Sequence, residues 1–118
     1  MTLDATALAT VLRRADGWEQ LVARAHEAGA TRISATAMAE AGMVLVARDG
    51  VTGVLGMHDV LTQLQATVVP FTESDWFHAV QAYHDRLKSP ALGPARFGAC
   101  LTAAIAARTG AAVLSARS

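Results

Sequence analysis

Short β-prone segments alternate with helical segments along this chain, and that alternation constrains the fold more than any other feature. We predict strands at residues 1–4, 31–34, 67–70 and 111–114. Strands separated by helices favour parallel pairing, because a parallel pair needs a crossover connection that a helix supplies. The pattern therefore predicts an α/β fold, namely a three-layer α/β/α sandwich with a short parallel sheet.

The predicted helices follow from apolar spacing and from their end signals. Helices are expected at residues 5–13, 35–49, 51–64 and 98–109, and glycine directly follows two of them, at Gly50 and Gly110. Two further helices are expected to begin at capping patterns, Asp16 with Glu19 and Thr72 with Asp75. Four residues of the second of these helices share one face at helical spacing, which predicts that they face the core: Trp76, Val80, Tyr83 and Leu87.

Length and composition favour one domain over residues 1–118, because 53% of the residues are hydrophobic and only 17% are charged. Residues 1–12 lack the basic start and long apolar stretch of a signal peptide. The longest nearly uncharged run, residues 33–47, is too short to span a bilayer and contains Glu40. The single Cys100 cannot form an internal disulfide, which is typical of a reducing compartment. We therefore expect a cytoplasmic protein without membrane contact.

Charge is unevenly distributed although the net charge is zero. No acidic residue follows Asp85, and the last third of the chain is therefore positive. The basic residues of this region are Arg86, Lys88, Arg96, Arg108 and Arg117. They are consistent with a surface that meets phosphates and equally with a solvated helix face.

Two carboxylates are candidates for chemistry. Asp4 stands where the first strand should give way to the first helix, so it can serve as a helix N-cap or as a ligand. Glu40 is the only charge between residues 33 and 47. A carboxylate in such surroundings needs an ion-pair partner, hydrogen bonds or a cation. A distant arginine is one possible partner, and a ligand role is the alternative that we favour.

Two carboxylates at the carboxyl ends of parallel strands suit Mg²⁺ or Mn²⁺, which prefer oxygen ligands. Nucleases use such ions to orient water and to stabilise charge on phosphate. Other residue types offer less. The histidines at 26, 58, 78 and 84 have no zinc-ligand spacing, and Cys100 in an apolar helix is typical of a packed thiol.

Several segments together resemble a known family. Residues 1–8 look like a hydrophobic strand followed by Asp-Thr/Ser-Ser/Thr-Ala-Leu, and residues 32–41 like a Ser-rich entry to a helix with a second acid. Residues 68–72 match a strand before a helical arm, and residues 83–100 the spacing of a loop into a Phe-Gly-Asp-Cys helix start. Residues 109–114 match a last strand. In order and spacing the chain resembles the PIN-domain family, particularly the VapC toxins of bacterial type II toxin–antitoxin pairs.

The resemblance implies a metal-dependent endoribonuclease with a PIN-like fold. Asp4 and Glu40 take the places of the first two acidic ligands for Mg²⁺ or Mn²⁺ and would be catalytic, and Thr6 takes the hydroxyl position beside the first acid. The implied partners are RNA, a small antitoxin-like protein and a second copy in a homodimer. The residues expected to touch RNA are Thr6, Arg86, Lys88 and Arg96.

The departures from the family pattern affect its metal site. Ala99 replaces the third acid, Arg96 replaces a preceding Asn, and the fourth acid would fall near or just beyond Ser118. The sequence leaves open whether Ala99 is natural or an engineered change. Each lost carboxylate reduces attraction for Mg²⁺, so weak metal binding and slow or absent hydrolysis are expected. We also hypothesise that Arg96 pairs with Asp4 or Glu40.

An alternative function is a non-catalytic interaction module. In this hypothesis the same fold binds an antitoxin-like helix or another copy of itself through an apolar helix face such as residues 54–64. The sequence does not decide between the two functions.

Overall fold

The computed structural model describes residues 1–116 and contains a four-stranded parallel sheet. The strands are β1 (Thr2–Leu3), β2 (Thr31–Ser34), β3 (Ala66–Val69) and β4 (Val113–Leu114), in the order β3-β2-β1-β4. The central strand β1 pairs with β2 and β4, and Leu3 lies opposite both Ile33 and Leu114. The prediction of an α/β fold with a short parallel sheet is confirmed.

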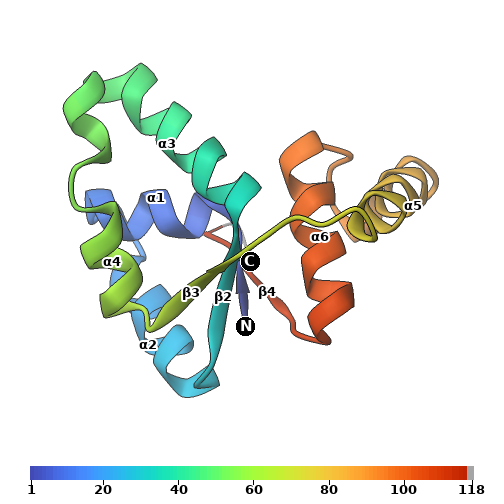
Figure 1. Cartoon of the computed structure of the whole chain (residues 1–118), viewed down its shortest axis with the longest axis horizontal. Helices are drawn as coiled ribbons and strands as arrows, with labels where there is room; N and C mark the ends of the chain where they lie inside the picture. The colour runs from blue at the N-terminus through green and yellow to red at the C-terminus, as the bar shows by residue number, and fades with distance from the viewer. Residues whose placement is uncertain (117–118) are drawn as a thin grey trace.

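Helices cover both faces of this sheet (Figure 1). On one side lie α1, α2 and α4, with α3 above them, and on the other side lies α6 with α5 packed outside it. The helices are α1 (Ala5–Arg13), α2 (Trp18–Ala28), α3 (Ala35–Asp49), α4 (Met57–Gln63), α5 (Asp75–Lys88) and α6 (Phe97–Thr109), with short 3-10 turns η1 (Val51–Val54) and η2 (Pro90–Leu92). None of the helices within residues 1–116 is long and apolar enough to cross a membrane.

Local capping explains which helix boundaries could be predicted. The side chains of Asp4 and Ser34 accept hydrogen bonds from the first turns of α1 and α3, and both helices have the predicted bounds. Asp16 is not a cap, because α2 begins after Gly17, whose backbone has φ 90°. The expected single helix over 51–64 is interrupted, because Gly56, also at φ 90°, ends the run before α4.

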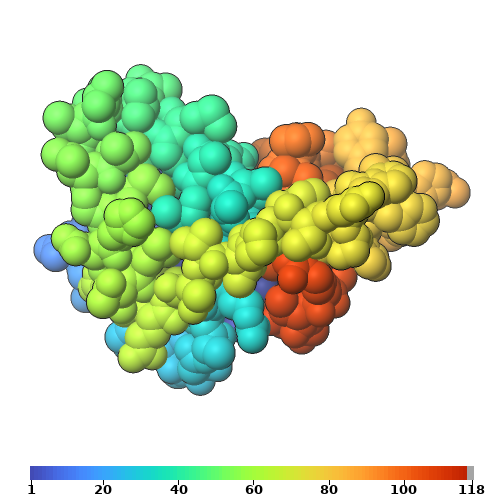
Figure 2. Space-filling model, in the orientation of Figure 1, coloured from blue at the N-terminus to red at the C-terminus, as the bar shows by residue number. Residues whose placement is uncertain are grey.

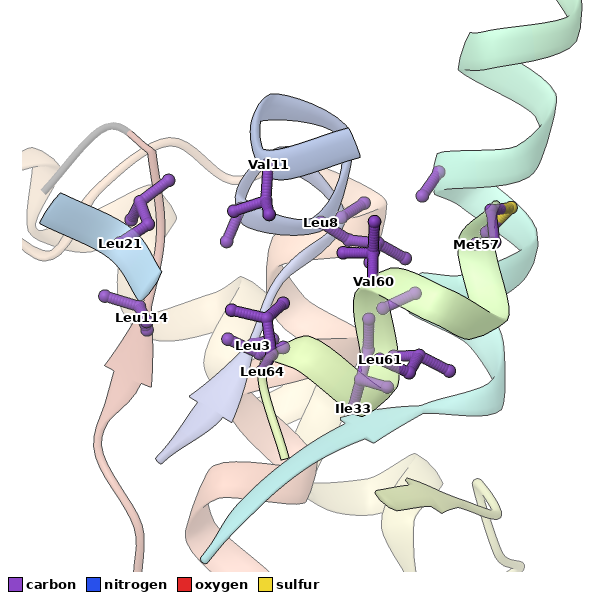
Figure 3. Close-up of a cluster of buried hydrophobic side chains, with 14 of the residues drawn as sticks. Leu3, Leu8, Val11, Leu21, Ile33, Met57, Val60, Leu61, Leu64 and Leu114 are labelled. Atoms are coloured by element: carbon purple, nitrogen blue, oxygen red, sulfur yellow. The ribbon is translucent and has the colours of Figure 1, made fainter. Parts of the chain in front are cut away.

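One apolar cluster joins the sheet to the helices on its first side. Leu3, Ile33 and Leu114 are fully buried on that face of the sheet. The labelled side chains of Figure 3 show how α1, α2 and α4 contribute to the cluster from above the strands. Most apolar side chains of residues 54–64 pack into it, because Val60, Leu61 and Leu64 are buried there, whereas Leu55 is exposed. That segment is therefore no free docking face, and this part of the interaction-module hypothesis is wrong.

A buried ion pair joins α5 to α6. Asp75 has no exposed surface, and its Oδ1 accepts a hydrogen bond of 2.8 Å from Nε of Arg108. Its Oδ2 accepts from the amide and hydroxyl groups of Thr72, which is one half of the predicted capping box. The other half is missing, because α5 begins at Asp75 after Ser74, whose side chain makes no capping hydrogen bond. Burial raises the pKa of Asp75, but the hydrogen bonds from Thr72 and the charge of Arg108 outweigh it and lower that pKa below its ordinary value.

The outer face of α5 is uncovered. Trp76, Val80, Tyr83 and Leu87 are 56%, 56%, 47% and 60% exposed, so the prediction that this stripe faces the core is wrong. Only Asp75 and Ala79 of α5 are buried, because the helix contacts α6 along a narrow line and projects at the right of the molecule (Figures 1 and 2). The helical spacing correctly shows that these four residues share one face of α5. It does not show whether another part of this chain packs against that face.

Replacing Asp75 by Asn is expected to lower the free energy of unfolding by about 2 kcal/mol at pH 7, because Arg108 then loses a charged partner. Since the folded-state pKa of Asp75 is lowered, its contribution is present above the unfolded-state value near pH 4 and is lost as pH falls below it. Urea denaturation at pH 7 and pH 3 measures both effects. Asp85→Asn, which changes an exposed carboxylate, is the control, and equal losses in the two variants would contradict the assignment.

Candidate functional site

A cleft of about 220 Å³ lies at the point in the sheet where the direction in which strands are added reverses. From β1 the chain builds outward through β2 to β3, and it then returns to place β4 on the other side of β1. Such a switch point, here between β1 and β4, leaves a crevice at the carboxyl ends of these two neighbouring strands. Asp4 follows β1 directly and Ser115 follows β4 directly, and both line the cleft.

Asp4 has one carboxylate oxygen engaged and one available. Its Oδ1 accepts hydrogen bonds from the amide of Ala7 at 2.9 Å and from the hydroxyl of Thr6 at 2.7 Å. The N-cap role and the cleft position therefore coexist in one side chain. No hydrogen bond to Oδ2 is found among the described residues, so this oxygen is available to a ligand.

Thr6 connects the first acid to the end of β4. Its hydroxyl shares a hydrogen bond of 3.0 Å with the hydroxyl of Ser115 and accepts one of 3.1 Å from the amide of Ala116. Together with its bond to Asp4, this arrangement fixes the carboxylate relative to β4. Thr6 also lines the cleft, so the hydroxyl expected beside the first acid lies there.

Glu40 enters the same cleft from α3, half-buried against the start of α6. A Cβ built on Gly98 would clash with both carboxylate oxygens of Glu40 and lie 2.6 Å from its Cδ. Only glycine at this position leaves the carboxyl group where it is. The positive end of the α6 dipole also favours a carboxylate there, because Gly98 is in the first turn of that helix.

Ala99 lines the cleft beside Gly98. A carboxylate side chain at this position would therefore lie on the wall of the cleft that Asp4 and Glu40 also line. Within residues 1–116 no group of three or more His, Cys, Asp or Glu side chains is arranged to hold a metal ion. The two acids leave a divalent ion with few protein ligands, which fits Mg²⁺, an ion that keeps most of its waters and binds through one or two carboxylates.

The basic residues divide between the cleft and its surroundings. Arg86 and Arg96 line the cleft, whereas Lys88 is exposed at the end of α5 and does not. Arg86 is half-buried, and its Nε is enclosed without a hydrogen-bond partner in the part of the chain described. Arg108 is committed to Asp75, and Arg117 lies outside the described residues.

The hypothesis that Arg96 pairs with an acid of the cleft is wrong for residues 1–116, where neither Asp4 nor Glu40 has a basic side chain within ion-pair distance. Arg96 precedes α6 in an extended conformation, with φ −97° and ψ 146°, and is exposed to water. Solvation of the guanidinium explains why no ion pair is needed. The two arginines therefore remain available to an anion that enters the cleft.

Sequence reasoning did not select Gly98, Ser115, Thr102 or the turn at Gly93 and Pro94 as parts of the site, although all line the cleft. The strand prediction contained a signal for Ser115, because it follows the last strand as Asp4 follows the first. Gly98 belongs to the segment that resembles a Phe-Gly-Asp-Cys helix start, but its role could not be predicted, since it depends on a contact between two helices that are remote in sequence. The position of the fourth acid lies outside the described residues.

The fold is similar to that of a solved toxin. The crystal structure of VapC20 from Mycobacterium tuberculosis, described as a toxin that cleaves the sarcin–ricin loop, matches with a TM-score of 0.69. The match covers 97% of this chain and 87% of the toxin at 13% sequence identity. The chain has a PIN-like fold. No protein-family model matches the sequence, and the comparison with curated proteins found no match.

Gly98→Ala is expected to displace the carboxyl group of Glu40 while the fold persists. The displaced atoms are the far end of a flexible side chain, and alanine within a helix gains up to about 1 kcal/mol over glycine. A crystal structure of the variant and its thermal unfolding curve measure the two effects. Gly42→Ala is the matched control, because a Cβ there meets only ordinary contacts, the nearest at 3.7 Å from Val54. A Glu40 carboxyl group that stays beside residue 98 would contradict the described packing.

Proposed function

We propose that this protein is a VapC-like, PIN-type endoribonuclease that depends on Mg²⁺ or Mn²⁺ and whose activity is weak or lost. The single observation that carries the proposal is the presence of Asp4 and Glu40 in one cleft at the switch point of a parallel sheet. The similarity in fold to a toxin that cleaves RNA supports it.

In this proposal the available Oδ2 of Asp4 and the carboxylate of Glu40 hold the divalent ion. When bound, such an ion lowers the pKa of water and stabilises the charge that develops on phosphate. Thr6 and the amide of Ala7 orient Asp4 by holding its other oxygen. The first turn of α6 and Gly98 keep Glu40 in place.

The arginines of the cleft would bind the RNA backbone. Arg86 and Arg96 stand among the cleft-lining residues with the two acids, and guanidinium groups bind phosphate through paired N–H donors. Thr6, which lies beside the first acid, would make a minor contact with the RNA. Lys88, which lies outside the cleft, would meet phosphates further along the strand.

Ala99 explains why the proposed activity is weak. A methyl group can neither coordinate a metal ion nor accept a hydrogen bond, and it lines the cleft where a third carboxylate would contribute charge. With two acids and two arginines around the cleft, the formal charge of these four side chains is zero, so the pull on a divalent cation is small.

The second candidate function is a non-catalytic interaction module of the same fold, acting in the cytoplasm with an antitoxin-like small protein or as a homodimer. The observation that favours it is the exposed apolar face of α5, with Trp76 56% and Leu87 60% exposed. Large exposed apolar surface on a small domain is typical of an interface.

Ala99→Asp tests the nuclease proposal. The substitution adds a third carboxylate to the cleft and is expected to tighten Mn²⁺ binding by roughly tenfold or more, because ligand charge governs affinity for such ions. Calorimetry measures the affinity, and cleavage of a structured RNA hairpin with an exposed loop, in Mn²⁺, measures the activity.

Ala107→Asp is the matched control, since it adds the same charge to an exposed position of α6 that does not line the cleft. It should leave both measurements unchanged. If Ala99→Asp increases neither metal affinity nor cleavage, the proposal of a degenerate nuclease fails.

A further inference from the structure

A second hollow, an apolar groove between α5 and α6, lies outside the cleft of the two acids. Its volume is about 350 Å³, within the range of about 300–1,000 Å³ that small-molecule sites occupy. None of the described residues that line it carries a charge. The rings of four aromatic residues line it, together with two buried small side chains: Phe71, Trp76, Tyr83 and Phe97, with Ala79 and Cys100. A groove of this kind suits a flat, uncharged group.

The first turn of α6 separates this groove from the cleft. Arg96, Gly98 and Ala99 line the cleft, whereas Phe97 and Cys100 line the groove. The two hollows therefore lie on two sides of one helical turn. Because Phe97 is 80% exposed, its ring is accessible to a ligand that extends out of the cleft past Arg96.

The end of α5 connects the two hollows in the same way. Tyr83 lines the groove and Arg86 lines the cleft, and residues three apart on a helix are neighbours on its surface. A guanidinium and an aromatic ring are therefore neighbours on both helices, as Arg86 with Tyr83 and as Arg96 with Phe97. Sites for single-stranded nucleic acid combine these two groups, since the cations follow the backbone and the rings stack with bases.

We propose that the groove binds an unpaired nucleobase of an RNA strand whose backbone phosphate lies in the cleft, with the base stacked against Phe97 and Tyr83. This inference rests on the proposed function, because it takes the ligand of the cleft to be RNA. A base can enter the groove only when it is unpaired and splayed out of its own stack. The substrate class is therefore RNA with an unpaired segment, such as a loop or an end, and not a regular duplex.

The charges at the end of the groove next to the cleft favour a polyanionic strand. No acidic residue follows Asp85 in the sequence. Asp85 itself is two residues from Tyr83, about 200° around the helix, and so lies on the opposite side of α5. Glu73 precedes α5 at the end remote from Arg86. The charges that adjoin this end of the groove are therefore the basic ones of Arg86 and Arg96.

Stacking dominates recognition in this groove. Among the lining residues described, only Trp76, Tyr83 and Cys100 have a polar group in the side chain. Every base has an aromatic face, whereas discrimination between bases needs hydrogen-bonding groups. We therefore expect the four bases to bind with similar affinity.

Binding of a labelled single-stranded RNA of about eight nucleotides to the full chain tests this inference by fluorescence anisotropy. Phe97→Ala is expected to weaken binding about tenfold, because stacking of one base contributes an effect of that order. The factor should be the same in Mn²⁺ and in EDTA, since the groove does not contain the two acids. Phe77→Ala is the matched control and should leave the affinity unchanged, because Phe77 is 58% exposed on α5 but does not line the groove. Circular dichroism verifies that the variants are folded.

An RNA of the same length with abasic sugars separates the groove from the cleft. Arg96→Ala should weaken binding of intact and abasic RNA alike, whereas Phe97→Ala should weaken binding of intact RNA only, since abasic RNA keeps its phosphates and lacks the rings. Equal affinities of Phe97→Ala and Phe77→Ala for intact RNA, with weaker binding by Arg96→Ala, would overturn the inference and leave the proposed function standing.

Two further outcomes count against the inference. If the wild-type chain binds no RNA, the proposed function fails and the inference fails with it. Unchanged RNA affinity of Phe97→Ala together with a change in its sedimentation would assign the groove to a protein surface instead.

Discussion

Parallel pairing of β1 with both β2 and β4 is the constraint on which the rest of the molecule depends. Because all four strands run the same way, the residues that follow β1 and β4 emerge side by side at one edge of the sheet. Asp4 and Ser115 take those places, and Thr6 joins them by hydrogen bonds. A cleft at this edge follows from topology, and its chemistry follows from the side chains that line it.

The second constraint is the contact between α3 and α6. Glu40 fits beside α6 only because residue 98 has no side chain. The next residue, Ala99, adds a methyl group where a carboxylate would strengthen attraction for a cation. The first turn of α6 therefore leaves room for the carboxylate of Glu40 at Gly98 but supplies no carboxylate at Ala99. The two arginines of the cleft further reduce the negative charge of the cleft. These features together account for the proposal of a PIN-type site with reduced metal affinity.

Local signals in the sequence predicted much of the fold, and non-local contacts account for what they missed. The bounds of α1 and α3 could be predicted because Asp4, Ser34 and Gly50 mark their ends. The break at Gly56 was missed because the apolar spacing of residues 54–64 continues through it. The convergence of Asp4 and Glu40 on one cleft was expected from the resemblance, whereas the burial of Asp75 by Arg108 and the exposure of Trp76 depend on how α5 meets α6.

The central claim is that Asp4, which follows β1, and Glu40 of α3 together hold a divalent ion. A crystal soaked in Mn²⁺ and measured at an anomalous wavelength tests it most directly. The account predicts one manganese peak in the cleft, within coordination distance of Oδ2 of Asp4 and a carboxylate oxygen of Glu40. Carboxyl groups that point to different sides of the cleft, with no manganese between them at millimolar concentration, would contradict it.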